Sequence, residues 1–190
     1  MSQDVRVRSV TADDADALQA MLSHGTVATM LADVPWPYPN DGAATFIATH
    51  TPTSDTYQSL DAVTFTPYGG DCVGFVSLRR ASRALRLSYF AAPVVWGRGV
   101  VTAAVGQVLD RTFDRDPNVV VEAGVFNDNP ASARVLHKLG FEPHAAAFPE
   151  CSAKGDTVGI ATYRLTADLW RSRTVDRQDA TTAARSNPNR

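Results

Sequence analysis

The sequence has few cysteines, no cysteine or histidine cluster and no export signal, and each absence excludes a class of protein. Only two of the 190 residues are cysteine, Cys72 and Cys151, and neither lies in a CxxC pair. No disulfide framework and no metal site are therefore expected. The two cysteines could in principle pair, but Met1–Asp4 lacks the basic-then-apolar pattern of a signal peptide. We therefore expect two free thiols in a cytoplasmic protein.

The sequence also lacks a basic block and a long apolar run. Its formal net charge is −2, and the 18 Lys and Arg residues are scattered, so nucleic acid is not an expected partner. The longest apolar stretches, such as Phe90–Trp96, are too short to span a bilayer. What is present is the composition of a globular protein, with 44% hydrophobic and 20% charged residues. The length suits one domain with a full core.

The pattern of apolar residues predicts an α/β (α+β) fold. Strands are expected at Val5–Arg8, Leu60–Thr66, Cys72–Leu78, Ala84–Phe90, Val119–Val125, from Phe141 and at Thr157–Leu165. Helices are expected from a Thr11 cap, over Gly42–His50 with Asp41 as its cap, and over Val101–Phe113 and Pro130–Leu139. A β-meander followed by β-α-β-α-β predicts a mixed, mostly antiparallel sheet with helices on both faces. We expect this domain to cover residues 1–173, followed by a disordered polar tail at 174–190.

The first candidate site is a glycine turn that follows a strand and opens a helix, Trp96-Gly97-Arg98-Gly99-Val100-Val101-Thr102. Glycines let the backbone approach an anion closely, and the first amides of a helix have no partner within it. Arg98 could add a charge-assisted contact to a phosphate. The alternative is a simple strand-to-helix turn. Neither GxxxxGK[ST] nor GxGxxG is present, so neither a P-loop nor a dinucleotide site is predicted.

The second candidate site is the start of the helix at Pro130–Leu139. Asn129 is a favoured N-cap, Pro130 takes the first helical position and Gly140 lies just past the end. A helix is therefore firmly predicted. From these residues alone, Asn129 could serve only as a cap and Ser132 could be only a small residue of the first turn.

Together, WGRGVVTAAV and NPASARVLHKLGF resemble the GNAT superfamily of N-acetyltransferases. More narrowly, they look like the ribosomal-protein N-terminal acetyltransferases of the RimJ/RimL type. The likeness runs from about Val5 to Trp170 and implies acetyl-coenzyme A as co-substrate and a sheet that is splayed at the cofactor site. It implies that the turn holds the diphosphate and that the strand edge at Ser88–Ala91 pairs with the pantetheine amides. The implied cofactor-binding residues are Phe90, Ala91, Val94, Trp96, Gly97, Arg98, Gly99, Val100, Val101, Thr102, Asn129 and Ser132.

The resemblance also indicates the chemistry. Many members of the superfamily carry a tyrosine acid at the position occupied here by Leu136, so Ser132 is expected to take that role. Val101 is a further departure, because the superfamily usually has Gly or Ala there. The candidate general bases are Glu122 and Glu150, although Glu122 could instead pair with an arginine and Glu150 could be a solvated loop acid.

The acceptor is expected to be an amine. A free α-amine has a pKa of about 8, so roughly a tenth is neutral at pH 7, whereas a lysine amine needs a stronger base than this sequence offers. A protein or peptide N-terminus is therefore favoured, with a small-molecule amine or a non-catalytic acetyl-coenzyme A sensor as alternatives. Trp36 and Tyr38 are the candidates for the acceptor pocket, although Trp36 could merely anchor its loop. A homodimer is possible.

Overall fold

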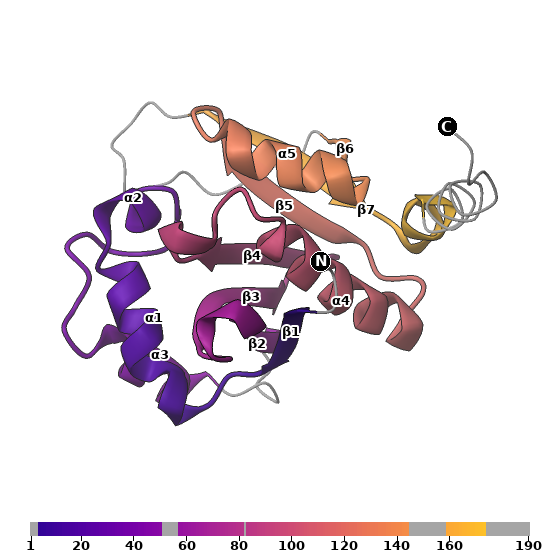
Figure 1. The fold of residues 1–190 in the computed structure, drawn as a ribbon. Coiled ribbons are helices and arrows are strands. Elements are labelled where there is room, and N and C mark those ends of the chain that lie inside the picture. The colour runs from indigo at the N-terminus through magenta and orange to yellow at the C-terminus, as the bar shows by residue number, and fades with distance from the viewer. Residues whose placement is uncertain (1–3, 51–56, 82, 145–158, 174–190) are drawn as a thin grey trace, which may run out of the picture.

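A seven-stranded sheet forms the centre of the protein in the computed structural model (Figure 1), which describes residues 4–50, 57–81, 83–144 and 159–173. The strand order is β1-β2-β3-β4-β5-β7-β6. The strands are β1 (Val5–Ser9), β2 (Tyr57–Phe65), β3 (Cys72–Arg80), β4 (Leu85–Ala91), β5 (Val121–Phe126), β6 (Glu142–Pro143) and β7 (Ile160–Leu165). The α-helices are α1 (Ala15–Leu22), α2 (Gly25–Ala28), α3 (Gly42–Thr49), α4 (Val100–Arg115) and α5 (Pro130–Leu139). Residues 167–173 are also helical. The mixed, mostly antiparallel sheet of the sequence prediction is confirmed.

The sheet is splayed at the junction of β4 and β5. These two strands are parallel, whereas all the other neighbouring strands are antiparallel. They pair over only two positions, Leu85 with Val121 and Arg86 with Glu122. Beyond these pairs, the stretch of β4 from Leu87 to Ala91 has no ladder partner on β5. The strands therefore diverge towards the carboxyl end of β4, where a ligand has access to main-chain groups.

Each face of the sheet is covered by a different set of helices. Leu78 and Leu87 face α4 and α5, and they share a buried core with Leu109 and Leu136 of those helices. Phe75 belongs instead to a smaller core on the opposite face, where it packs with residues of α1 and α3. Figure 1 shows α4 and α5 near the splayed strands and α1 to α3 grouped at the other end of the molecule. The gap between β4 and β5 thus connects two differently covered faces.

The approach to α1 is fixed by a buried carboxylate. Asp14, which is 3% exposed, accepts a hydrogen bond from the Thr11 amide at 2.9 Å. Its two oxygens also accept bonds from the two terminal nitrogens of Arg8, at 2.7 Å each. The expected Thr11 cap is present, but its first turn is a 3-10 helix, Ala12–Asp14, which α1 follows. The chain from β1 to α1 is therefore held by one carboxylate.

Two local details differ from the sequence predictions. Asp41 takes the N-cap position of α3 but makes no side-chain capping bond. Gln19 of α1 supplies the acceptor instead, because its Oε1 accepts a bond from the Ala43 amide at 3.1 Å. The short helix α2 was also not predicted, since four residues are too few for a periodic apolar pattern. The Gln19 bond joins segments 24 residues apart, which no local pattern predicts.

Candidate active site

A cavity of about 960 Å³ occupies the splayed region of the sheet. Its lining comes from β3, β4 and β5, from the turn before α4, from the start of α5, and from the segment that joins α2 to α3. The cavity therefore extends from the helix N-termini on one face of the sheet to the aromatic side chains on the other. It is large enough for the arm of a cofactor and an acceptor to meet inside it.

The glycine turn presents free amides to this cavity. Gly97 and Gly99 have φ values of +72° and +77°, which only glycine adopts without strain. Gly99 is the N-cap of the 16-residue helix α4. Among the described residues, the amides of Gly99, Val100, Val101 and Thr102 find no acceptor, and all four residues line the cavity. Free amides at the positive end of a helix dipole make this turn suited to a phosphate group.

The remaining residues of the turn have different roles. Trp96 and Gly97 line the cavity, and the Trp96 indole N–H donates to the Ala91 carbonyl at 2.8 Å, which ties the turn to the end of β4. Arg98 lines a smaller neighbouring hollow instead, and its guanidinium carbon lies 5.9 Å from the centre of the Tyr68 ring. Val94 is 54% exposed and lies outside the cavity lining.

The start of α5 brings Ser132 to the cavity. The Asn129 side chain accepts a bond from the Ser132 amide at 3.1 Å, so Asn129 is a true N-cap, and both residues line the cavity. Leu136, one turn further on, is fully buried in the core. The helix is bounded by Pro130 and Gly140 as predicted, with Gly140 at a φ of +85°. The capping bond therefore holds the backbone of Ser132 in place, and with it the position of the Ser132 hydroxyl.

Tyr89 of β4 is a site residue that sequence reasoning missed. Its hydroxyl lies 2.7 Å from Ser132 Oγ, a hydrogen bond in which either oxygen could donate, and it lies 3.2 Å from the Ser132 carbonyl. Burial raises the pKa of the Tyr89 phenol to about 12, although the hydrogen bond with Ser132 opposes this shift. The phenol therefore stays protonated at physiological pH and keeps a proton beside Ser132. The sequence feature that could have identified Tyr89 is the alternation of side chains along a strand, which places it on the same face of the sheet as Leu87.

Of the two candidate general bases, only Glu122 lies within the described residues. Glu122 lies on β5 next to Arg86 of β4 and Arg164 of β7 in the sheet register, and it is not among the residues that line the cavity. Its register neighbours are thus two arginines, and its role as a general base stays a prediction. Glu150 lies outside the described residues.

The acceptor side of the cavity is aromatic. Tyr38 lines it, with its ring packed so closely over Gly42 that a Cβ there would lie 2.8 Å from the ring. Phe75 and Phe90 stack with their ring centres 5.4 Å apart on the cavity floor. Trp36 is 51% exposed, lies against Gly25 and is absent from the lining. The loop thus contributes Tyr38 rather than Trp36 to the cavity.

The protein thus has a splayed mixed α/β sheet, with free helix amides and a partly buried hydroxyl pair at the opening between β4 and β5. The family model of the acetyltransferase (GNAT) domain matches residues 4–142. The chain belongs to this family of acetyltransferases. No curated protein matches the chain in sequence.

Solved structures share the fold over nearly the whole chain. Ribosomal-protein-S5-alanine acetyltransferase from Vibrio fischeri is 18% identical, with a TM-score of 0.73, and the match covers 88% of this chain and 95% of that one. Spermidine N-acetyltransferase from Vibrio cholerae, solved with CoA and spermine, is 14% identical, with a TM-score of 0.75 and coverage of 88% and 98%. A GNAT-family acetyltransferase from Bacillus anthracis is 13% identical, with a TM-score of 0.74 and coverage of 87% and 96%. At these identities, the likeness shows the fold alone.

The described residues also lack two kinds of feature. They contain no helix that is both long and apolar enough to cross a membrane. They also contain no group of three or more His, Cys, Asp and Glu side chains placed to hold a metal ion. Cys72 is a free, half-buried thiol whose pKa is raised by burial, and Cys151 lies outside the described residues.

Proposed function

We propose that this protein transfers the acetyl group of acetyl-coenzyme A to the α-amine of a protein or peptide N-terminus. One observation carries the proposal. The Ser132 hydroxyl, held 2.7 Å from the partly buried Tyr89 phenol, lines the same cavity as the free amides at the start of α4. An anion site and a proton donor in one cavity are what acyl transfer from a phosphorylated thioester carrier needs.

The residues of the turn fit the cofactor. The amides of Gly99, Val100, Val101 and Thr102 would hold the diphosphate, with the α4 dipole adding favourable field. The unpaired stretch of β4, which includes Phe90 and Ala91, would bond the amides of the pantetheine arm. Arg98, on the neighbouring hollow, would reach the phosphates from outside the cavity. When bound, acetyl-coenzyme A supplies the activated acetyl group.

As the amine nitrogen bonds the thioester carbonyl carbon and the C–S bond breaks, the Ser132 hydroxyl would donate a proton to the departing sulfur. The proton that the attacking amine loses would pass to solvent and restore the hydroxyl, which Tyr89 orients. When the Tyr89 O–H donates to Ser132 Oγ, the serine proton is free to point into the cavity. The thiolate has a solution pKa near 8.5, so one hydroxyl donor is enough to assist its departure. The acceptor α-amine has a pKa of about 8, and on the order of a tenth is already neutral at pH 7. A strong base is therefore not required, which agrees with the position of Glu122 outside the cavity lining.

A small-molecule amine is the second candidate acceptor. The observation in its favour is the shared fold with the spermidine N-acetyltransferase of Vibrio cholerae. The same fold is shared with an enzyme named for a ribosomal-protein alanine, so the fold does not decide between them. The α-amine is preferred because it is the acceptor that tolerates the weakest base.

The test combines cofactor binding with turnover. Ser132→Ala should bind acetyl-coenzyme A with unchanged Kd but release thiol about 100-fold more slowly with an N-terminal peptide panel, the scale of a lost acid catalyst. Ser23→Ala, at an exposed serine whose hydroxyl accepts a bond from the Gln19 side chain, is the control and should keep full activity. Normal rates in Ser132→Ala would remove Ser132 from the mechanism. Tight binding of the cofactor without thiol release from any amine would favour the sensor instead.

A further inference from the structure

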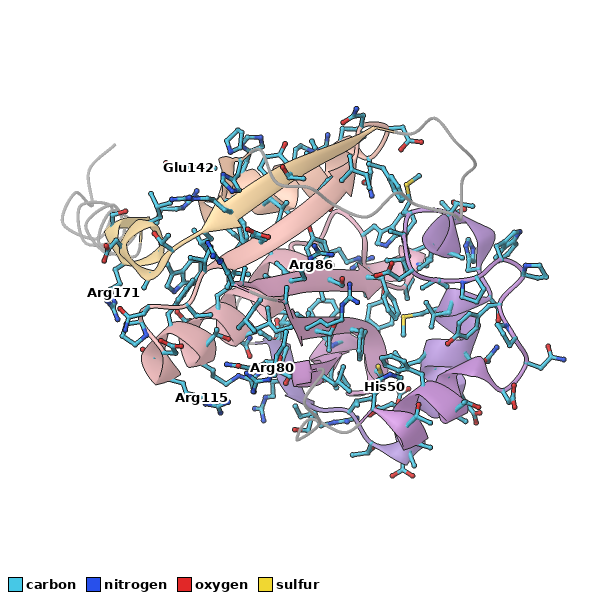
Figure 2. All side chains as sticks on the ribbon, turned by 180° about the vertical axis from the view of Figure 1, so that it is seen from behind. His50, Arg80, Arg86, Arg115, Glu142 and Arg171 are labelled. Atoms are coloured by element: carbon cyan, nitrogen blue, oxygen red, sulfur yellow. The ribbon has the colours of Figure 1, made fainter. Side chains whose placement is uncertain are left out.

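Two arginines lie directly opposite each other on the floor of the cavity. Arg79 of β3 and Arg86 of β4 are cross-strand partners, and both line the cavity. Figure 2 shows Arg86 over the middle of the sheet, on the face turned away from the viewer in Figure 1. Like charges placed directly opposite each other in a sheet are unfavourable. Such a pair gains from an anion that binds both guanidinium groups.

These arginines end a row of charges that crosses the sheet. Glu122 of β5 is next to Arg86, Arg164 of β7 is next to Glu122, and Glu142 of β6 is next to Arg164. The signs alternate from β4 to β6, and the alternation breaks only between Arg86 and Arg79. Where the row enters the cavity, two positive charges therefore lie side by side.

An acidic side chain from outside the sheet, Asp33, approaches Arg79. Asp33 lies 3.5 Å from Arg79, but their side chains are 72% and 38% exposed. An ion pair this long and this open to water contributes little. Asp33 therefore leaves Arg79 able to bind a second carboxylate.

The position of the pair along β4 indicates which ligand it faces. The floor runs from the stacked Phe75 and Phe90, through Ser77 and Ser88, to Arg79 and Arg86. Arg86 is five residues from Ala91, about 17 Å along a strand, but only three residues, about 10 Å, from Tyr89. The glycine turn lies at the Ala91 end of β4, where the Trp96 indole bonds the Ala91 carbonyl. The arginines thus lie beyond the reacting hydroxyls, on the side away from the diphosphate.

We infer that Arg79 and Arg86 bind a carboxylate of the acceptor, so that the preferred acceptor is a peptide with Asp or Glu at its second or third position. This inference rests on the proposed function and names its substrate class. Planar guanidinium groups bind carboxylates through paired, charge-assisted hydrogen bonds. A polyamine or a lysine-rich N-terminus would instead bring further positive charge to the pair and is selected against.

The test uses matched peptides that differ only at the second and third positions, with Glu, Gln or Lys there, together with free glutamate and spermidine. We expect the Glu peptide to exceed the Lys peptide about tenfold or more in kcat/KM, with the Gln peptide between them. Arg79→Gln and Arg86→Gln should raise KM for the Glu peptide and leave the Gln peptide and the Kd for coenzyme A unchanged. Arg79→Glu should shift the preference towards the Lys peptide.

Arg80→Gln is the matched control, because Arg80 follows Arg79 on β3 but is exposed and absent from the cavity lining. It should keep the preference for Glu. Equal rates with Glu and Lys peptides, a preference for spermidine, or a preference that survives Arg79→Gln would each overturn the inference. Glutamate acetylated faster than any peptide would support the carboxylate site but contradict the peptide acceptor. Coenzyme A binding without transfer to any amine would contradict the proposed function itself.

Discussion

At the residue scale, the contact between Tyr89 and Ser132 is the feature on which the proposed chemistry depends. The two residues are 43 positions apart in the chain, and β4 and α5 bring their oxygens within 2.7 Å. Asn129 fixes the Ser132 backbone through its capping bond. Ser132 is held by the cap of α5 and Tyr89 by its place in β4, and the fold brings the two side chains together.

We expect Tyr89→Phe to lower kcat about tenfold while leaving the Kd for coenzyme A and the KM for the acceptor unchanged. The phenol acts through Ser132, so its loss removes the hydrogen bond that orients the serine hydroxyl. The measurement is steady-state thiol release over pH 6 to 9, alongside calorimetric binding. Because the phenol pKa is about 12, its titration adds no step to the profile of the unmodified protein in this range.

Tyr163→Phe is the control, since Tyr163 is a buried tyrosine of the core against which Tyr89 packs but does not line the cavity. It should keep normal kcat. A Tyr89→Phe protein with an unchanged kcat would show that the hydroxyl pair is only structural.

The sequence predicted several residues that line the cavity. Asn129, Ser132 and the glycine turn carry local signatures of capping and positive φ, which a sequence displays directly. Tyr89 carries none, because its role depends on a contact between β4 and α5. Trp36 and Tyr38 share one proline-rich segment, and no local rule decides which of them turns towards the cavity.

At the scale of elements, helix ends and strand ends position the site. Helix α5 has the bounds that its Asn, Pro and Gly signals predicted, and α4 begins one residue before the predicted start. These signals act between residues that are close in the sequence, so the helix ends can be predicted without knowledge of the tertiary contacts. The early separation of β4 and β5 has no such signal, and it was expected only from the resemblance to the family.

The link between β1 and α1 gives a prediction on stability and pH. Burial alone would raise the pKa of Asp14, but hydrogen bonds from Arg8 and Thr11 outweigh it and lower the pKa. A carboxylate with a lowered pKa in the folded state stabilises the fold above its unfolded pKa of about 3.9. This contribution is lost as the pH falls through the folded value. We expect Asp14→Asn to reduce the free energy of unfolding by about 1 kcal/mol at pH 7, since Arg8 is partly exposed and screened.

Urea unfolding from pH 7 to pH 3 checks this. The difference between the unmodified protein and Asp14→Asn should shrink below about pH 4. Asp13→Asn, at the exposed neighbouring acid, is the control and should have little effect at any pH. A difference that stays constant down to pH 3 would mean that the Asp14 charge does not stabilise the fold.

At the scale of the whole molecule, the two faces of the sheet have separate tasks. The face under α4 and α5 offers amides and a hydroxyl pair, and the opposite face offers stacked aromatic rings and two arginines. The gap between β4 and β5 joins them in one cavity. In the proposed reaction, the cofactor therefore enters from one face and the acceptor from the other.

The most direct measurement is a crystal structure with coenzyme A bound. The account predicts the diphosphate on the amides of Gly99 to Thr102, the pantetheine arm along β4 from Leu87 to Ala91, and the sulfur within hydrogen-bond reach of Ser132 Oγ. Coenzyme A bound elsewhere on the protein, or bound with its sulfur far from Ser132, would contradict it.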